Sequence, residues 1–322
     1  YFICRSDQKY LNTWHGTPLK TLGHDMQGRW LEHKNAARNF LQATHLLSPN
    51  AHTSAVMLDS HGITGLYGGQ FMEGGYPRAD LTVAASAAYQ QTMRSLLQLD
   101  PCRPVVLYAP TWRGTLGSVD FDIQRLQDDL AALHAAGHQV LFRGHSLAQD
   151  LIRSQAPHIT LVPGEIDTSS LLSIVDVLIT DYSSTFFEFI SLRRPILYYA
   201  YDQEQYLSGR GTYFALEEMP GQVCTTQAQL LASLQTTDHW MAEPSMQAKY
   251  DSACEKFCPH DDGQATARTV AWFFHGQDLL PQYASSTTLQ DTTQTVLLFC
   301  GPFMGNGITS AKVETANLAW GY

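Results

Sequence analysis

The chain has 322 residues, of which 44% are hydrophobic, which is enough for two domains with substantial cores and too apolar for a disordered protein. Its formal net charge of -10 argues against non-specific binding to nucleic acid, which depends on a broad excess of Lys and Arg. No apolar run is long enough to span a membrane and the N-terminus lacks the pattern of a secretory leader, so we predict a cytoplasmic protein.

The first distinctive feature is the stretch "NTWHGTPLK" at residues 12–20. Gly16 and Pro18 are incompatible with regular structure, so we predict that His15 lies where a strand gives way to a turn. A lone histidine in such a turn is typical of a catalytic site. The chain begins with Tyr1 and enters this turn within a few residues, so we expect an earlier part of the first domain to be missing.

Residues 1–100 show the alternation of a partial α/β domain. The pattern predicts a helical stretch around 29–41, a short apolar strand in "THLLS" and a helix over 51–58. The glycine-rich segment "GLYGGQFMEGGYPRADL" follows, closed by Pro77 and Arg78, and we predict a loop that faces a cleft.

Residues 101–280 show a cleaner pattern, which opens with the apolar run "PVVLYAP", typical of a strand buried on both faces of a parallel sheet. The helix expected next, "FDIQRLQDDLAALHAAG", places Ile123, Leu126, Leu130 and Leu133 on one face and ends at Gly137. Four more strands are predicted in "HQVLFRGH", "HITLVP", "VDVLIT" and "PILYYA", with a helix in "SSTFFEFISL". This order predicts a doubly wound parallel sheet that binds its ligand beyond the carboxyl ends of its strands.

Residues 281–322 have the composition of a polar linker followed by "TVLLFCGPFMGNGITSA", the expected start of a further α/β unit. The alternative is a terminal strand and helix that pack back on the main body. The six cysteines are spread thinly, which fits reduced thiols. Only "CEKFCPH" is a candidate metal site, with Cys254, Cys258 and His260 as ligands, but the spacing is not that of a zinc knuckle. We interpret it as a helix end with two half-buried thiols and expect no metal.

Three strand ends in residues 101–280 carry side chains that suit phosphate. They are Thr111 and Arg113 in "YAPTWRG", Arg143 and His145 in "LFRGHS", and Asp181, Ser183 and Ser184 in "LITDYSSTFFEF". Serines at a helix N-terminus have free backbone N–H groups behind them and the positive end of the helix dipole, and arginine completes a phosphate site. Taken alone, "DYSS" is equally well a plain helix cap. The convergence of three strand ends favours phosphate binding.

Six segments, "WHGTPLK", "GYPRADL", "YAPTWR", "TDYSSTFFEF", "PILYYAYDQEQY" and "FCPHDDGQATAR", resemble in order the motifs of the CDP-glycerol glycerophosphotransferase family of teichoic acid and capsule polymer synthases. They cover most of residues 10–275. The resemblance implies an α/β fold of the GT-B type, with two Rossmann-like domains facing across a cleft and the donor nucleotide held by the C-terminal one. It also implies a transfer of glycerol phosphate from CDP-glycerol to a hydroxyl of a lipid-linked polymer, releasing CMP without a metal or other cofactor. The enzyme would be peripheral at the cytoplasmic face of the membrane.

Three positions depart from the family pattern. Glu188 stands where the family usually has aspartate, Ala79 where it has asparagine, and Gln222 ends a turn that is usually Pro-Gly-Pro. The carboxylate of Glu188 still suits a ribose hydroxyl, whereas the change at Gln222 leaves the acceptor or polyol open.

Our mechanistic hypothesis divides these residues between donor and acceptor. In it Arg113, Ser183 and Ser184 hold the diphosphate with help from Thr111 and Arg143, Asp181 orients the loop by bonding backbone N–H groups, and Glu188 meets the ribose. His15 accepts the proton of the acceptor hydroxyl, because imidazole titrates near working pH. His145 stabilises phosphate charge or protonates the CMP leaving group. Gly16, Thr17 and Lys20 are assigned to substrate binding, although Lys20 also fits a solvated lysine at a helix start.

Three alternatives remain open. A GT-B glycosyltransferase with a nucleotide sugar would use the same phosphate site, and a transferase that uses CDP-ribitol would carry the same motifs. A catalytically silent nucleotide-binding module is the third. Retention of both His15 and His145 speaks against the third, because the fold needs neither histidine.

Overall fold

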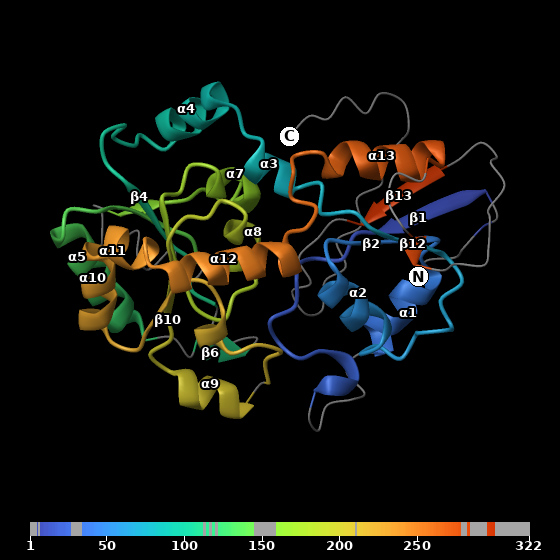
Figure 1. The fold of residues 1–322 in the computed structure, drawn as a ribbon, viewed down its shortest axis with the longest axis horizontal. Helices are drawn as coiled ribbons and strands as arrows, with labels where there is room; N and C mark the ends of the chain where they lie inside the picture. Colours follow the sequence, from blue (N-terminus) through green and yellow to red (C-terminus); the bar gives the residue numbers. More distant parts are fainter. Residues whose placement is uncertain are drawn as a thin grey trace. The chain divides into compact units, whose positions relative to one another are not determined.

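The structure is a computed structural model that describes residues 5, 7–26, 34–111, 114–115, 118–119, 122–144, 159–209, 211–277, 282–283 and 295–299 (Figure 1). Its contacts divide the chain into two compact units. Unit 1 comprises Tyr1–Pro77 and Lys256–Tyr322, and unit 2 comprises Arg78–Glu255.

Unit 1 is built on a sheet whose described strands have the order β12-β3-β2-β1-β13. These strands are β1 (Gln8–Asn12), β2 (His45–Ser48), β3 (Gln70–Glu73), β12 (Gln282–Tyr283) and β13 (Thr295–Phe299). All neighbours pair in parallel except β12, which runs antiparallel to β3. The helices described in this unit are η1 (Gly23–Asp25), α1 (Lys34–Gln42), α2 (Ala51–Leu58) and α13 (Ala265–His275).

Successive strand residues of unit 1 enter two different cores, because side chains alternate between the faces of a sheet. One core contains Tyr10, Leu46 and Phe71 with residues of α1 and α2, and the other contains Leu11, Leu47 and Met72 with Trp272 and Phe273 of α13. Figure 1 shows α13 on one side of this sheet and α1 and α2 on the other. The apolar strand in "THLLS" and the helix over Ala51–Leu58 are confirmed.

The C-terminal part of the chain differs from expectation. We predicted a linker and a further α/β unit over residues 281–322, but the two strands described there join the edges of the unit 1 sheet, as the alternative of a terminal strand packed on the main body anticipates. β13 pairs with the whole of β1, from Gln8 opposite Thr295 to Asn12 opposite Phe299. A strand that follows a parallel sheet in the chain can satisfy its backbone hydrogen bonds at an open sheet edge, and this strand does so.

Unit 2 contains a parallel sheet whose described strands have the order β11-β10-β9-β4-β7-β8, together with a small antiparallel pair, β5 and β6. The strands are β4 (Val105–Tyr108), β5 (Gly114–Thr115), β6 (Ser118–Val119), β7 (Gln139–Phe142), β8 (Thr160–Leu161), β9 (Val177–Thr180), β10 (Ile196–Tyr199) and β11 (Gln222–Cys224). The described helices are α3 (Ala79–Val83), α4 (Ala87–Leu96), α5 (Ile123–Ala135), α7 (Thr168–Leu172), α8 (Thr185–Ile190), α9 (Gln203–Gly209), η2 (Leu216–Glu218), α10 (Gln227–Gln235), α11 (Thr237–Met241) and α12 (Pro244–Phe257), whose last two residues belong to unit 1.

The strand order makes unit 2 a doubly wound sheet. The chain starts at β4, moves outward through β7 and β8, returns to β9 on the other side of β4, and continues through β10 and β11. The direction therefore reverses between β4 and β9, and open α/β sheets bind ligands at the carboxyl ends beside such a switch point. Helices cover both faces: Tyr199 of β10 bonds Asp129 of α5, and Tyr198 packs its ring against Phe186 of α8 at 5.1 Å.

The boundary between the units lies elsewhere than expected. We predicted domains over residues 1–100 and 101–280, but α3 and α4 belong to unit 2 and α13 belongs to unit 1. Buried Thr82 of α3 donates to the Ser169 carbonyl at 2.8 Å, and Arg94 of α4 donates to the Ile174 carbonyl at 3.1 Å. These bonds explain why the helices before residue 101 stay with the second sheet.

Candidate functional site

The switch point of unit 2 is bridged by Asp181. This carboxylate, 2% exposed, follows β9 and accepts the backbone N–H of Thr111, which follows β4, at 2.8 Å and 3.1 Å to its two oxygens. Thr180 adds a second bridge, because its hydroxyl donates to the Ala109 carbonyl at 2.8 Å. The expectation that Asp181 bonds a backbone N–H group is confirmed. The two loops that meet at the switch point are thus fixed to one another.

The loop after Asp181 leads into α8 with two half-buried serines. Ser183 accepts the backbone N–H of Thr185 at 3.3 Å and lies 2.9 Å from the Thr185 hydroxyl. Ser184 is the N-cap residue of α8, but its side chain makes no capping hydrogen bond. Ser183 therefore has local partners in Thr185, whereas the N-cap residue Ser184 does not use its hydroxyl as a cap.

Arg143 follows β7, the neighbour of β4 in the sheet. Its backbone N–H donates to the Tyr108 carbonyl at 3.0 Å, and its guanidinium Nη1 donates to the Ile166 carbonyl at 2.6 Å. Burial lowers the pKa of this guanidinium from its usual value, and the charge of Asp167 opposes that shift. The predicted partners Arg113 and His145 lie outside the described residues.

Glu188 of α8 is held by other groups of unit 2. Its Oε1 accepts from Nε and Nη2 of Arg78 at 3.0 Å and 2.7 Å, and its Oε2 accepts from the Ser169 hydroxyl at 3.1 Å. Sequence reasoning placed Glu188 on a ribose and missed this ion pair. A carboxylate has about four acceptor positions, so a further hydroxyl is compatible with these bonds.

His15 lies in the turn that follows β1 of unit 1. The turn is strained at Trp14, which has a left-handed backbone with φ of 54°, whereas Gly16, with φ of 154°, has no Cβ and takes its conformation without strain. The Asn12 side chain accepts the Trp14 N–H at 2.9 Å, and the Trp14 ring packs against Phe40 at 5.0 Å. His15 itself is exposed, with its ring 3.9 Å from that of Trp14. The predicted transition from a strand to a turn is confirmed.

The other predicted residues of this turn differ in exposure. Gly16 and Thr17 are buried and Lys20 is half-buried. The Thr17 hydroxyl accepts a hydrogen bond from the Asn50 side chain at 3.0 Å, so Thr17 faces the interior of unit 1. Asn50 is the N-cap of α2, as an asparagine immediately before the predicted helix over 51–58 indicates, but sequence reasoning did not connect it with the turn of His15.

The cysteine segment ends a helix, as expected. α12 stops at Phe257, and Cys254 and Cys258 are both half-buried. Among the residues that the structure describes, no three His, Cys, Asp or Glu side chains gather as metal ligands. Within the same residues, no helix is both long enough and apolar enough to cross a bilayer.

A doubly wound sheet with a polar switch point in unit 2, together with a second unit built on a largely parallel sheet, defines an α/β protein of the GT-B type, as predicted. The family model described as CDP-Glycerol:Poly(glycerophosphate) glycerophosphotransferase matches residues 1–275. The chain belongs to this family, which confirms the resemblance of its motifs.

Known relatives agree with this assignment. The chain is 34% identical to a teichoic acid poly(glycerol phosphate) polymerase of Staphylococcus epidermidis over 83% of its own length and 39% of that protein. It is 31% identical to a teichoic acid glycerol-phosphate transferase of Staphylococcus aureus, over 82% of this chain and 71% of the transferase. The solved wall teichoic acid polymerase TagF has a TM-score of 0.71 and 30% identity, over 84% of this chain and 68% of the TagF chain. One structure of TagF is a histidine-to-asparagine variant soaked with CDPG.

Proposed function

We propose that this chain transfers glycerol phosphate from CDP-glycerol to a hydroxyl of a teichoic acid or related polymer and releases CMP. The observation that carries the proposal is the switch point of unit 2, where Asp181 fixes the loop after β9 to Thr111 after β4. Doubly wound sheets bind nucleotides at this place, and family membership supports CDP-glycerol as the nucleotide.

The donor diphosphate is assigned to the polar residues of unit 2. Ser183 and Ser184 offer hydroxyl groups in the loop before α8, Thr111 offers its own after β4, and Arg143 adds positive charge after the neighbouring strand β7. Arg113 and His145 belong to the same motifs and complete the assignment, with Glu188 toward the ribose. Phosphoryl-type transfer needs fixed donors around the phosphate more than covalent participation by the protein.

The base is assigned to His15 of unit 1. The acceptor oxygen attacks the phosphorus that bears glycerol, the bond from that phosphorus to the CMP oxygen breaks, and His15 takes the proton of the attacking hydroxyl. CMP leaves with the electron pair of the broken bond and is protonated by His145 or by water. Gly16 keeps the turn compact and Lys20 attracts the anionic acceptor.

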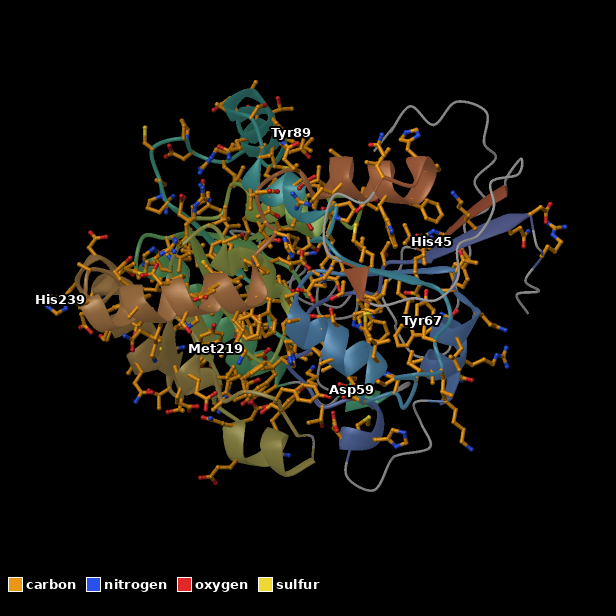
Figure 2. All side chains as sticks on the ribbon, turned by 45° about the vertical axis from the view of Figure 1, so that its right-hand side comes forward. His45, Asp59, Tyr67, Tyr89, Met219 and His239 are labelled. Atoms are coloured by element: carbon orange, nitrogen blue, oxygen red, sulfur yellow. The ribbon has the colours of Figure 1, made fainter. Side chains whose placement is uncertain are left out.

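The His15→Ala variant tests this assignment. We expect turnover to fall by about 10² to 10⁴, the usual effect of losing a positioned general base, while the Kd for CDP-glycerol stays within about twofold because unit 2 holds the donor. CMP release and donor calorimetry measure the two quantities. The control is His239→Ala, whose side chain is 84% exposed and lies at the outer edge of unit 2 (Figure 2). Near-normal turnover in His15→Ala would contradict the mechanism.

Donor choice is tested with CDP-glycerol, CDP-ribitol and a nucleotide sugar at equal concentration. Product from the ribitol donor alone, or from the sugar alone, would replace the glycerol assignment, and nucleotide binding without product from any donor would leave a silent binding module. We further propose that the acceptor is lipid-linked and that the protein works at the cytoplasmic face of the membrane, as the family resemblance implies. Flotation with vesicles that carry the acceptor lipid tests this contact.

A further inference from the structure

Asn50 is a fully buried side chain at the N-terminus of α2 that makes four hydrogen bonds. Its Oδ1 accepts from the backbone N–H and the hydroxyl of Thr53, both at 2.9 Å, which is the bonding of an N-cap. Its Nδ2 donates to the Thr17 hydroxyl at 3.0 Å and to the Phe257 carbonyl at 2.8 Å. The cap uses only the oxygen, so the two bonds from Nδ2 need a separate explanation.

The two Nδ2 bonds reach segments far from α2 in the chain. Thr17 lies two residues after His15 in the strained turn, and Phe257 lies where the chain has just returned to unit 1. A second side chain of α2 reaches the same turn, because His52 Nε2 lies 2.8 Å from the Pro18 carbonyl, which accepts the ring hydrogen. The first turn of α2 therefore holds the turn at two successive residues.

Asn50 is itself held rigidly. Its backbone carbonyl accepts from the Ser48 hydroxyl at 2.9 Å and lies 3.0 Å from the Ser54 hydroxyl, whose single hydrogen also has Glu73 Oε2 within 2.7 Å. Ser48 and Ser54 are fully buried. Buried polar groups that satisfy one another specify a single geometry, since breaking one bond leaves an unpaired group in the interior.

We propose that Asn50 and Thr17 are positioning residues for His15, acting through a buried hydrogen bond that fixes the turn which presents the imidazole. The proposal rests on the assignment of His15 as the base. The left-handed backbone of Trp14 costs energy and persists only where the surroundings over-determine it, and the bonds from α2 to Thr17 and Pro18 supply that constraint. Neither Asn50 nor Thr17 needs to touch the substrate in this role.

The chemistry of this position selects an amide. An aspartate at residue 50 would retain the cap to Thr53 but would lose both donors and place a charge against the Phe257 carbonyl. A serine would retain a cap and would be too short to reach two further acceptors. Only a side chain with an acceptor and two donors can satisfy all four partners.

The test compares Thr17→Val with Thr17→Ser and with Thr82→Val. Valine keeps the shape of threonine and removes the acceptor for Asn50 Nδ2, whereas serine keeps it. Thr82 is the matched control, because it is another buried threonine whose hydroxyl bonds elsewhere, to the Ser169 carbonyl of unit 2. The readouts are kcat, the KM for CDP-glycerol, and hydrogen exchange of peptides that cover residues 13–20, all on the full chain.

We expect Thr17→Val to lower kcat by about 10-fold to 10²-fold with KM for the donor unchanged, because a small displacement of a catalytic group has effects of this size. Exchange in residues 13–20 should rise in Thr17→Val, whereas Thr17→Ser should recover most of the kcat and Thr82→Val should lose none. Wild-type kcat in Thr17→Val, or an equal loss in Thr82→Val, would overturn the proposal. If the wild-type protein turns over no CDP-glycerol, the proposed function fails separately. Unchanged exchange in residues 13–20 of Thr17→Val would then still overturn the positioning role.

Discussion

Asp129 shows how a single buried carboxyl group makes stability depend on pH. It lies on α5, 1% exposed, and its Oδ1 accepts from the Tyr199 hydroxyl at 3.2 Å and from Gln227 Nε2 at 2.8 Å. Its Oδ2 is buried and has no hydrogen-bond partner among the described residues. Burial raises the pKa of Asp129, and the two hydrogen bonds to Oδ1 oppose this. The folded protein therefore holds a proton here more tightly than the unfolded chain does.

Asp129→Asn should become more favourable relative to wild type as the pH rises. Between the unfolded pKa near 3.8 and the raised folded pKa, the folded state binds more protons, so the wild type loses stability as pH rises through that window. Asparagine carries no charge to bury. We expect the melting temperature of the variant minus that of wild type to increase by a few degrees between pH 4 and pH 8. Asp128→Asn, an exposed neighbour on α5, should show no such increase, and a constant difference for Asp129→Asn would contradict the argument.

At the residue scale, sequence predicts the type of group better than its environment. The location of His15 in a turn could be predicted, because Gly16 and Pro18, its near neighbours in the sequence, specify a turn there. Thr17 was assigned to substrate and is buried against Asn50, which is 33 positions away in the chain, and no local pattern reports that contact. Glu188 was matched by its carboxylate, whereas its ion pair with Arg78 spans 110 positions.

α13 packs on β2 through a buried histidine. His45 of β2 is 2% exposed, and its ring lies 5.0 Å from that of Trp272 and 4.8 Å from that of Phe273. Its Nδ1 lies 2.8 Å from the Thr44 hydroxyl. Burial, and to a smaller extent the charge of Lys9, lowers the pKa of His45 to about 4. The contact between these two elements thus requires a neutral imidazole.

Acidification should therefore loosen α13, and His45→Phe should prevent this. The unfolded pKa is near 6.5 and the folded pKa near 4, so the unfolded state binds more protons between them and stability falls as pH decreases through that range. The full loss is on the order of 3 kcal/mol. The Thr44 hydroxyl keeps its bonds to the Tyr10 backbone in the variant. We expect the drop in melting temperature between pH 7 and pH 4.5 to shrink clearly in His45→Phe, whereas His239→Ala should retain it. An equal drop in both variants would refute the role of His45.

Among elements, the strands with continuous apolar runs were predictable. β4, β7, β9 and β10 all fall within the segments expected from hydrophobicity, and α5 ends before Gly137, whose φ is 87°. The pairing partners of these strands could not be predicted in the same way. A strand that follows directly in the chain and a strand that is distant in the chain show the same apolar pattern. β13 was recognised as a strand, but nothing in its residues shows that it pairs with β1.

At the scale of the whole molecule, unit 1 is assembled from two parts of the chain that flank unit 2. Its second core forms only when Trp272 and Phe273 of α13 meet strand residues such as Leu11 and Leu47. The Arg268 side chain of α13 also helps to hold this second chain segment on unit 1. It donates to the Gly74 carbonyl at 3.1 Å and to both oxygens of Asp262 at 2.9 Å and 2.8 Å. Unit 2, in contrast, is one continuous segment, so it is the part of the molecule with the simplest route to independent folding.

A fragment of residues 78–255 should therefore fold, whereas the fragment 101–280 suggested by sequence should not. The first keeps α3 and α4 with their bonds to Ser169 and Ile174, and the second lacks both helices and exposes the apolar face of α13. We expect a cooperative melt and a monomeric elution for 78–255, and aggregation for 101–280. If unit 2 holds the donor, 78–255 should also bind CMP with a Kd within about threefold of that of the full chain, and the double variant Ser183→Ala, Ser184→Ala should weaken that binding by about 10-fold because two hydroxyl donors to phosphate are lost. If 101–280 is stable and 78–255 is unfolded, the domain boundary lies near residue 100 after all. If 78–255 folds but does not bind CMP, the donor site is not at the switch point between β4 and β9.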